Sequence, residues 1–401
     1  MILKMNWITN TDTIIFDAKF NECIDPELIS TYTKLIFSNY ALNEQLFEYY
    51  SSGDLKNLKW IGSSFNQDVL NLSPSITHLT FGWLFDKDVS NLPPFLTHLI
   101  FGSYFNQNVS KLPQNITHLT FGHWFNQNVS NLPCSITYLT FSWVFNRDVK
   151  SLPPFLTHLR FGTSFDQDVS KLPQGIINLT FGHYFNKDVS NLPSFLTHLT
   201  FGTSFDQDVS KLPQGITNLT FGHYFNQNVS NLPSFLTHLI FGDNFNQDIS
   251  NLPPFLTHLT FGEYFNQDIS KLPRGIIYLT FGLNFNRECY IPSSVKYLKL
   301  DCNNQYMIDS LPNSIVELEL YHNFSLKMDN LPTSIKKLII RRDSYFNADL
   351  NSLPDFIEEL QLNKSYNKPI LHIPSNLKKI ICHKDYQYIN DFASYNIEIY
   401  T

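Results

Sequence analysis

Histidine is the residue in this sequence whose spacing most suggests chemistry. Seven histidines share one column of a 20-residue period, and Tyr138, Asn178, Asn218 and Tyr278 fill its remaining positions. The seven are His78, His98, His118, His158, His198, His238 and His258. Imidazoles on neighbouring strands could bridge a metal ion. One column, however, supplies ligands along a line rather than around a tetrahedron, and no carboxylate accompanies it. We therefore interpret the column as polar rings stacked on an exposed sheet face.

Catalytic signatures are missing elsewhere in the sequence. It has no Ser-His-Asp signature, no glycine-rich phosphate loop and no paired acids outside the repeated columns. The five cysteines (Cys23, Cys134, Cys289, Cys302 and Cys382) form no CxxC pair, which argues against a zinc site and a disulfide scaffold. We predict a non-enzyme without cofactor or metal, in the reducing environment of the cytoplasm.

A variable pair of residues lies between each repeated Gly and the next Phe, whereas its surroundings stay nearly constant. The pair is rich in Trp, Tyr and His, and Trp and Tyr are typical of interface hot spots. Positions just after a strand lie at the rim of the face with which solenoids usually bind. The candidate partner-binding residues are Trp83, Tyr104, His123, Trp124, Trp143, His183, Tyr184, His223, Tyr224 and Tyr264. The alternative, neutral drift at positions without packing constraint, stays open.

The repeat decides the fold. From Ser75 to Phe285 the chain repeats every 20 residues, one copy running from Phe95 to Gln114. Residues 161–200 and 201–240 differ at four positions, which indicates duplication of a two-repeat unit. Duplication multiplies a structural unit, whereas an active site needs different groups that converge on one point.

Apolar columns define the strand and the core of each copy. Leu99 and Phe101 alternate with exposed neighbours, which is typical of a strand with one buried face. The recurring apolar residues are Leu96, Leu99, Phe101, Phe105, Val109 and Leu112. Equivalent strands must pair in parallel, and stacked copies bury these residues continuously. We predict a β-rich solenoid with one long parallel sheet, about 20 residues per turn and few or no helices.

Three polar or small columns predict turns. Asn106 and its Asn or Asp equivalents can accept a hydrogen bond from backbone N–H groups at a tight corner. Pro113 fixes φ where no ladder N–H is needed, and Gly102 follows the strand where the backbone must bend.

The repeat unit resembles a known family. Residues 99–117, Leu-Ile-Phe-Gly-Ser-Tyr-Phe-Asn-Gln-Asn-Val-Ser-Lys-Leu-Pro-Gln-Asn-Ile-Thr, are similar to the FNIP repeat. That family is related to leucine-rich repeats and occurs in amoebal and giant-virus proteins. Its members often carry an N-terminal F-box that recruits a ubiquitin ligase. Asp25–Phe37 resembles the opening of an F-box only faintly, and repeat signals at Phe20 and Phe37 bracket it.

The ends read as divergent repeats of one solenoid domain, residues 1–401. We assign 1–70 to an N-terminal cap, 71–286 to regular repeats and 287–401 to divergent repeats with a C-terminal cap, about 19 strands in all. The N-terminal strand signals are Ile14–Phe16, Leu35–Phe37 and Leu58–Trp60. In the tail, Glu317, Lys337, Glu359 and Lys379 occupy equivalent strand positions, which predicts cross-strand ion pairs.

Composition narrows the function. The net charge of −7 argues against broad nucleic-acid binding, and no run of about 18 apolar residues could span a membrane. We expect a non-catalytic scaffold that binds a protein partner through the exposed sheet face and its rim. A second interpretation is substrate recognition together with ubiquitin-ligase subunits. If the protein is viral, we expect it in the host cytoplasm.

Overall fold

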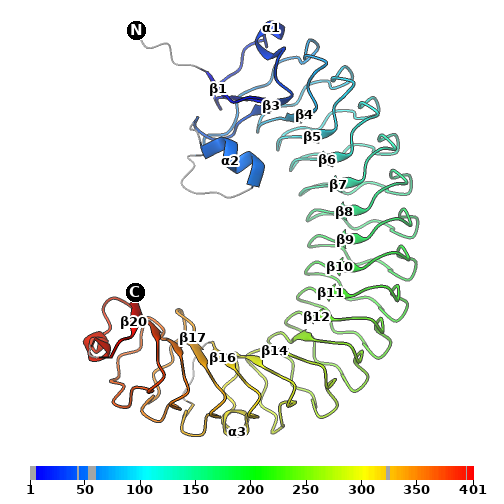
Figure 1. Cartoon of the computed structure of the whole chain (residues 1–401). Helices are drawn as coiled ribbons and strands as arrows, with labels where there is room; N and C mark the ends of the chain where they lie inside the picture. The colour runs from blue at the N-terminus through cyan, green and yellow to red at the C-terminus, as the bar shows by residue number, and fades with distance from the viewer. Residues whose placement is uncertain (1–5, 43–44, 53–59, 322–325, 394) are drawn as a thin grey trace. The chain divides into compact units, whose positions relative to one another are not determined.

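The computed structural model describes residues 6–42, 45–52, 60–321, 326–393 and 395–401. Residue contacts divide the chain into two compact units, residues 1–202 and residues 203–401. In both units each turn of the chain adds one short strand to a parallel sheet, as the ribbon shows (Figure 1). Both units are therefore β-solenoids, as the 20-residue period predicts.

Unit 1 holds ten strands and two short helices within its described residues. The strands are β1 (Trp7–Thr9), β2 (Thr13–Phe16), β3 (Lys34–Phe37), β4 (His78–Thr80), β5 (His98–Ile100), β6 (His118–Thr120), β7 (Tyr138–Thr140), β8 (His158–Arg160), β9 (Asn178–Thr180) and β10 (His198–Thr200). The helices are α1 (Pro26–Ile29) and α2 (Gln45–Ser52). Strands β2 to β10 pair in parallel, each with the next, and β1 pairs antiparallel with β2.

Unit 2 continues the pattern with ten strands. They are β11 (Asn218–Thr220), β12 (His238–Ile240), β13 (His258–Thr260), β14 (Tyr278–Phe281), β15 (Tyr297–Leu300), β16 (Glu317–Leu320), β17 (Lys337–Ile340), β18 (Glu359–Gln361), β19 (Lys379–Ile381) and β20 (Glu398–Tyr400). Strands β11 to β20 pair in parallel, each with the next. Helix α3 (Gln305–Asp309) and the 3₁₀ turn η1 (Ile389–Phe392) lie in the connections.

The six apolar columns form the core, as predicted. Leu99 and Phe105 are completely buried, and Phe101 is 3% exposed. Within a turn the rings of Phe101 and Phe105 stack with centroids 3.7 Å apart, and Phe105 lies 6.1 Å from Phe85 in the preceding turn. No turn can bury these residues alone, so stability depends on the neighbouring turns.

Asparagine and aspartate tie one turn to the next. The Asn106 side chain accepts a hydrogen bond from the backbone N–H of Asn126 (2.9 Å), and Asp86 accepts one from Asn106 (2.9 Å). The prediction of a short side-chain acceptor is confirmed, but its donor lies 20 residues away rather than in its own corner. Asn and Asp both serve because only the side-chain oxygen is used.

The glycine column has a different cause from the predicted bend. A Cβ atom on Gly102 would lie 1.7 Å from the carbonyl oxygen of Gly82. Among the described glycines, positive φ occurs only at Gly62, which stands 20 residues before Gly82 and precedes the regular repeats. Glycine is therefore required by close approach of successive turns, with Ser142 as the one exception between Gly82 and Gly282.

The N-terminal region departs from the predicted repeat. Strand β3 pairs directly with β4, and Trp60, the described residue of the strand expected at Leu58–Trp60, belongs to neither of them. Leu58 lies outside the described residues, and Trp60 forms only an isolated antiparallel bridge with Tyr40. The antiparallel β1 and helix α2 were not predicted.

Candidate interaction surface

Six rings from successive turns form a continuous surface that we call the aromatic rim. They are Trp60, Trp83, Tyr104, His123, Trp124 and Trp143. The five after Trp60 lie in tight turns directly after the strands of unit 1, at the carboxyl edge of its sheet. Five of the ten sequence candidates therefore come together here.

Ring contacts link the members of the rim. The centroid of Trp83 lies 5.2 Å from Trp60, 5.9 Å from Tyr104 and 6.3 Å from His123. His123 lies 5.5 Å from Trp143, and Tyr104 lies 6.4 Å from Trp124. The rings thus contact one another across one or two turns of the solenoid.

Large parts of these rings face solvent. Trp60, Trp124 and Trp143 are 51%, 53% and 54% exposed, and Tyr104 is 46% exposed, whereas Trp83 and His123 are half-buried. The core is complete without the rim, because the apolar columns beneath it are already buried.

Backbone hydrogen bonds hold the rim in place. The N–H of Tyr104 donates to the carbonyl oxygen of Trp83 (3.0 Å), and the N–H of Trp124 donates to that of Ser103 (2.8 Å). The N–H of Val144 likewise donates to His123 (3.0 Å). Because each turn is bonded to the turn before it, the backbone that carries the rings is fixed before any partner arrives.

The other five candidates do not extend this surface. Thr163 and Ser164 separate His183 and Tyr184 from the rim, and these two rings contact each other at 4.5 Å. In unit 2, His223 contacts Tyr224 and its Nδ1 lies 2.8 Å from a carboxylate oxygen of Asp243. Tyr264 is 49% exposed, in the turn after β13.

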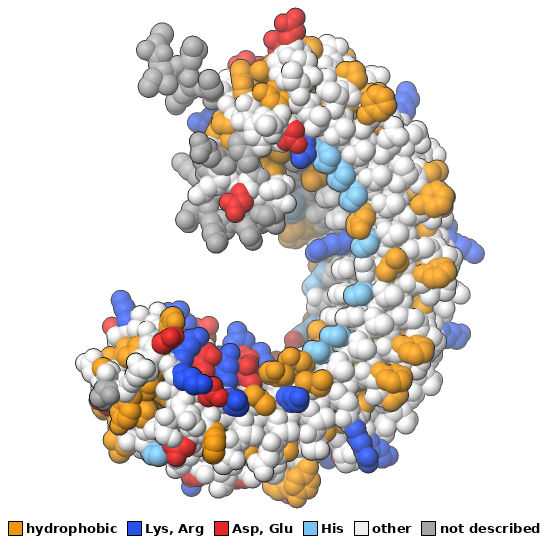
Figure 2. Space-filling view, in the orientation of Figure 1, with side chains coloured by type: hydrophobic (Ala, Val, Ile, Leu, Met, Phe, Trp, Pro, Cys, Tyr) orange, Lys and Arg blue, Asp and Glu red, His pale blue; other side chains and the backbone are white. Residues whose placement is uncertain are grey.

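The histidine column forms a ring ladder on the solvent-facing side of unit 1. We use this name for His78, His98, His118, Tyr138 and His158 on β4 to β8. Figure 2 shows histidine side chains in a row along the sheet. Successive centroids lie 4.1 to 4.3 Å apart with nearly parallel planes. The prediction of stacked polar rings is confirmed. Among the described residues, no group of three or more His, Cys, Asp and Glu side chains is arranged to hold a metal ion.

A threonine next to each histidine of this column determines which ring nitrogen of the neutral imidazole carries the proton. The hydroxyl of Thr97 donates to the carbonyl oxygen of Thr77 (3.1 Å), and Nδ1 of His98 lies 2.9 Å from the same hydroxyl. Since that hydroxyl proton is used, Nδ1 carries the imidazole proton and Nε2 is left as an acceptor. Burial, together with His78 and His118 on either side, lowers the pKa of His98 to about 4.

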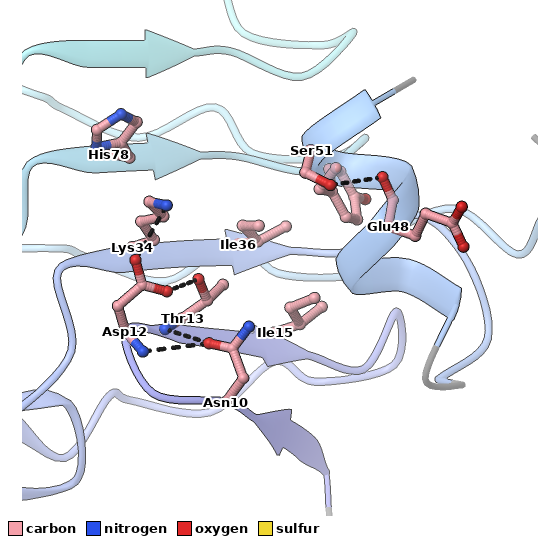
Figure 3. A pocket seen from close by; sticks show the side chains of 10 residues that line it. Asn10, Asp12, Thr13, Ile15, Lys34, Ile36, Glu48, Ser51 and His78 are labelled. Carbon is pink, nitrogen blue, oxygen red and sulfur yellow. Dashed lines mark hydrogen bonds and ion pairs between the residues drawn. The ribbon is translucent and has the colours of Figure 1, made fainter. Parts of the chain in front are cut away.

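Unit 1 also contains a cavity of about 530 Å³ where α2 covers the beginning of the sheet (Figure 3). Ile15 and Ile36 form its apolar side together with Tyr50 of α2. Asp12 and Lys34 pair at 3.0 Å on its polar side, and the Thr13 hydroxyl and Lys34 lower the pKa of Asp12. One sequence feature could have indicated this cavity: Ile15 and Ile36 are apolar at the strand position where most other strands carry Thr. The feature is not specific, because Ile100 occupies the same position and is 44% exposed.

The family can be assigned at this point. Matches to the family described as FNIP Repeat cover residues 65–104, 88–123, 105–143, 125–164, 168–204, 188–224, 225–264, 249–284, 265–303, 285–322 and 346–385. The chain belongs to the FNIP repeat family. The FNIP matches begin at residue 65, after the divergent region that contains α2.

One solved structure, that of CroV588, supports a leucine-rich-repeat-like fold for these FNIP repeats. The chain is 28% identical to CroV588, described as a novel circular LRR protein, over 95% of this chain and 77% of that one, with a TM-score of 0.53. InlJ from Listeria monocytogenes is 15% identical over 84% of this chain and 71% of that one, with a TM-score of 0.48. YopM from Yersinia enterocolitica is 19% identical, with coverage of 81% and 68% and a TM-score of 0.42. Comparison with curated proteins gave no match.

The segment with a faint F-box resemblance folds as part of the solenoid. Asp25 caps the four-residue helix α1, and the chain then enters strand β3. Residues 25–37 therefore contain one turn of helix rather than the start of a three-helix domain. Association with a ubiquitin ligase stays a prediction from the family resemblance.

Proposed function

We propose that this FNIP repeat protein is a scaffold that binds a protein partner through the aromatic rim of unit 1. The observation that carries the proposal is the contiguity of the rings. Trp83, at the centre, contacts three other aromatic side chains from neighbouring turns. Clustered Trp and Tyr side chains provide a large contact area and are the residues most enriched at binding hot spots.

Exposure of these rings needs an explanation in terms of function. Three tryptophans that are each about half exposed in one cluster leave apolar surface in water, which costs free energy unless a partner covers it. Drift would scatter tryptophans along the turns, whereas four of the five tryptophans of the sequence lie between Trp60 and Trp143.

The cysteines fit an intracellular scaffold. All five cysteines are free, and two of them, Cys23 and Cys134, are exposed. Free exposed thiols are typical of a reducing compartment. No helix within the described residues is long and apolar enough to cross a membrane.

Site-specific photo-crosslinking tests the proposal. A photoreactive amino acid replaces Trp124 in one variant and Ser164, the equivalent position two turns later, in the matched control. Both are expressed in the native cell. We expect one partner protein to be cross-linked at position 124 and not at position 164. Equal cross-linking at both positions would contradict a site at the rim.

A further inference from the structure

A single arginine charges the solvent-facing side of the sheet of unit 1. The first and third residues of strands β4 to β10 lie on this side, which we call the inner face. Arg160, the third residue of β8, is the one Lys, Arg, Asp or Glu among them, and its side chain is exposed. Within the described residues its guanidinium group forms no ion pair or hydrogen bond. A cation on an otherwise uncharged face attracts an anionic group of a binding partner.

Threonine hydroxyls lie on both sides of this arginine. The parallel register places Thr140 of β7 and Thr180 of β9 directly beside Arg160, and both are half-buried on the inner face. A hydroxyl can donate a hydrogen bond, and a guanidinium group offers several N–H donors in a planar fork. An ionised carboxylate only accepts hydrogen bonds and matches this fork with both of its oxygens. The group of donors therefore fits a carboxylate.

The amount of charge favours a carboxylate over a phosphate. A phosphorylated side chain carries nearly two negative charges and is usually bound by a cluster of arginines. The nearest Lys or Arg on the inner face in the N-terminal direction is Lys34 of β3, five strands or roughly 24 Å away, where it pairs with Asp12 at 3.0 Å. Burial, and after it the charge of His198, lowers the pKa of His158, so this neighbour adds no positive charge at neutral pH. Arg160 thus offers one charge for one carboxylate.

The arginine adjoins the aromatic rim. The N–H of Phe141 donates to the carbonyl oxygen of Arg160 (2.8 Å), and Trp143 follows Phe141 by two residues. The Cα atoms of Arg160 and Trp143 therefore lie within roughly 12 Å of each other, a distance that about four residues of extended chain can span. The variable pairs that follow β4 to β9 contain no Asp or Glu that could neutralise Arg160. One short segment of a partner can cover Trp143 and reach Arg160.

We infer that the partner bound at the aromatic rim presents an Asp or Glu side chain to Arg160, within about four residues of the apolar side chain that covers Trp143. The inference rests on the proposed function and adds the chemistry of the partner to it. Apolar contacts at the rim supply affinity, and Arg160 selects among apolar segments, because a basic residue at its position is repelled.

Peptide selection tests this without knowledge of the partner. A library of random 12-residue peptides displayed on phage is selected on the full-length protein as wild type, as Arg160→Glu and as Lys111→Glu. Lys111 is an exposed cation in the corner before Pro113, so the control removes the same charge outside the inner face. We expect the wild type and Lys111→Glu to enrich Asp or Glu within four residues of Trp, Phe or Leu. Arg160→Glu should enrich Lys or Arg in that place.

Affinities of a synthesised selected peptide complete the test. Replacement of its acidic residue by the corresponding amide should weaken binding to the wild type at least tenfold and leave binding to Arg160→Gln unchanged. Apolar peptides that need Trp143 but show no acidic preference would overturn the inference and leave the rim in place. Acidic peptides that need Arg160 but bind Trp143→Ser as tightly as the wild type would contradict the rim itself, and with it the inference. Tighter binding of phosphoserine than of Glu at the same place, or no peptide that depends on position 160, would also overturn it.

Discussion

The ring ladder of unit 1 consists of the first residues of its strands. In unit 2 the first residues of β16 to β19, Glu317, Lys337, Glu359 and Lys379, form ion pairs instead, and we call this set the ion-pair ladder. In the first, His78 and His98 stack at 4.1 Å, and in the second, Lys379 and Glu359 approach to 3.2 Å. In a parallel sheet in register each residue faces its own equivalent. Identical neutral rings can stack on one another, whereas identical charges repel.

This difference explains how charge is distributed along the chain. Residues 71–280 carry 22 charged side chains in 210 positions, and residues 281–401 carry 27 in 121. Duplicated turns, such as the two-repeat unit shared by 161–200 and 201–240, copy existing turns and so favour neutral ladders. Charge enters where the turns have diverged and signs can alternate.

The largest effect on stability is expected in the buried phenylalanine core, which both units share. Phe105→Ala in unit 1 and Phe346→Ala in unit 2 each remove a completely buried ring and should cost about 3–5 kcal/mol of unfolding free energy. Denaturant unfolding measures both. Phe155→Ala is the control, since that ring is 67% exposed, and should cost less than about 0.5 kcal/mol. A loss below about 1 kcal/mol at Phe105 would show that the core is wrongly assigned.

A smaller effect is expected from breaking the alternation of charge. Lys337→Glu puts three carboxylates on consecutive strands, which replaces two attractions with two repulsions and should cost about 1–2 kcal/mol. Inversion of all five charges, at Glu317, Lys337, Glu359, Lys379 and Glu398, keeps the alternation and should be nearly neutral. If the fivefold variant is less stable than Lys337→Glu, register pairing is not the source of the stability.

Acid should destabilise the two regions in different pH ranges. Burial lowers the pKa values of His78, His98 and His118, so the unfolded state binds more protons below about pH 6.5 and stability falls from there toward pH 4. In unit 2, a hydrogen bond from Lys378 lowers the pKa of Glu358 below its usual 4.5. The stability that ionised Glu358 contributes is therefore fully present above about pH 4.5 and is lost only as the pH falls below that value.

Hydrogen exchange read by region between pH 4 and pH 7 checks this order. Strands β4 to β8, which carry the ring ladder, should lose protection before β16 to β19, and a variant with Gln at His78, His98 and His118 should retain more of it. Identical pH profiles for the variant and the wild type would show that the ring ladder is not the acid-sensitive element.

Sequence reasoning reached the features that repeat and missed those that do not. The core columns, the parallel register, the ring ladder and the ion pairs of Glu317, Lys337, Glu359 and Lys379 followed from period and residue type. The glycine column was placed correctly but explained wrongly, because contact between Gly102 and Gly82 depends on the distance between turns. Helix α2 and the antiparallel strand β1 lie in two separate stretches, and neither stretch shows the 20-residue period.

The rim was predicted in part for the same reason. Trp83, Tyr104, His123, Trp124 and Trp143 were recognised as variable positions in a constant frame. Their contacts with one another, and the participation of Trp60, depend on side-chain directions that no pattern encodes. His183, Tyr184, His223, Tyr224 and Tyr264 share the pattern and lie outside the cluster.

The most direct test of the proposed function measures affinity for the cross-linked partner after its purification. Trp83, Tyr104, Trp124 and Trp143 are replaced together by Ser, and unchanged circular dichroism must first show that the variant is folded. Glu317→Lys with Lys337→Glu is the control and should affect stability more than binding. Because a few aromatic anchors usually carry most of an interface's energy, we expect the fourfold variant to lose at least about 100-fold in affinity. Affinity within about threefold of the wild type would contradict a partner site at the aromatic rim.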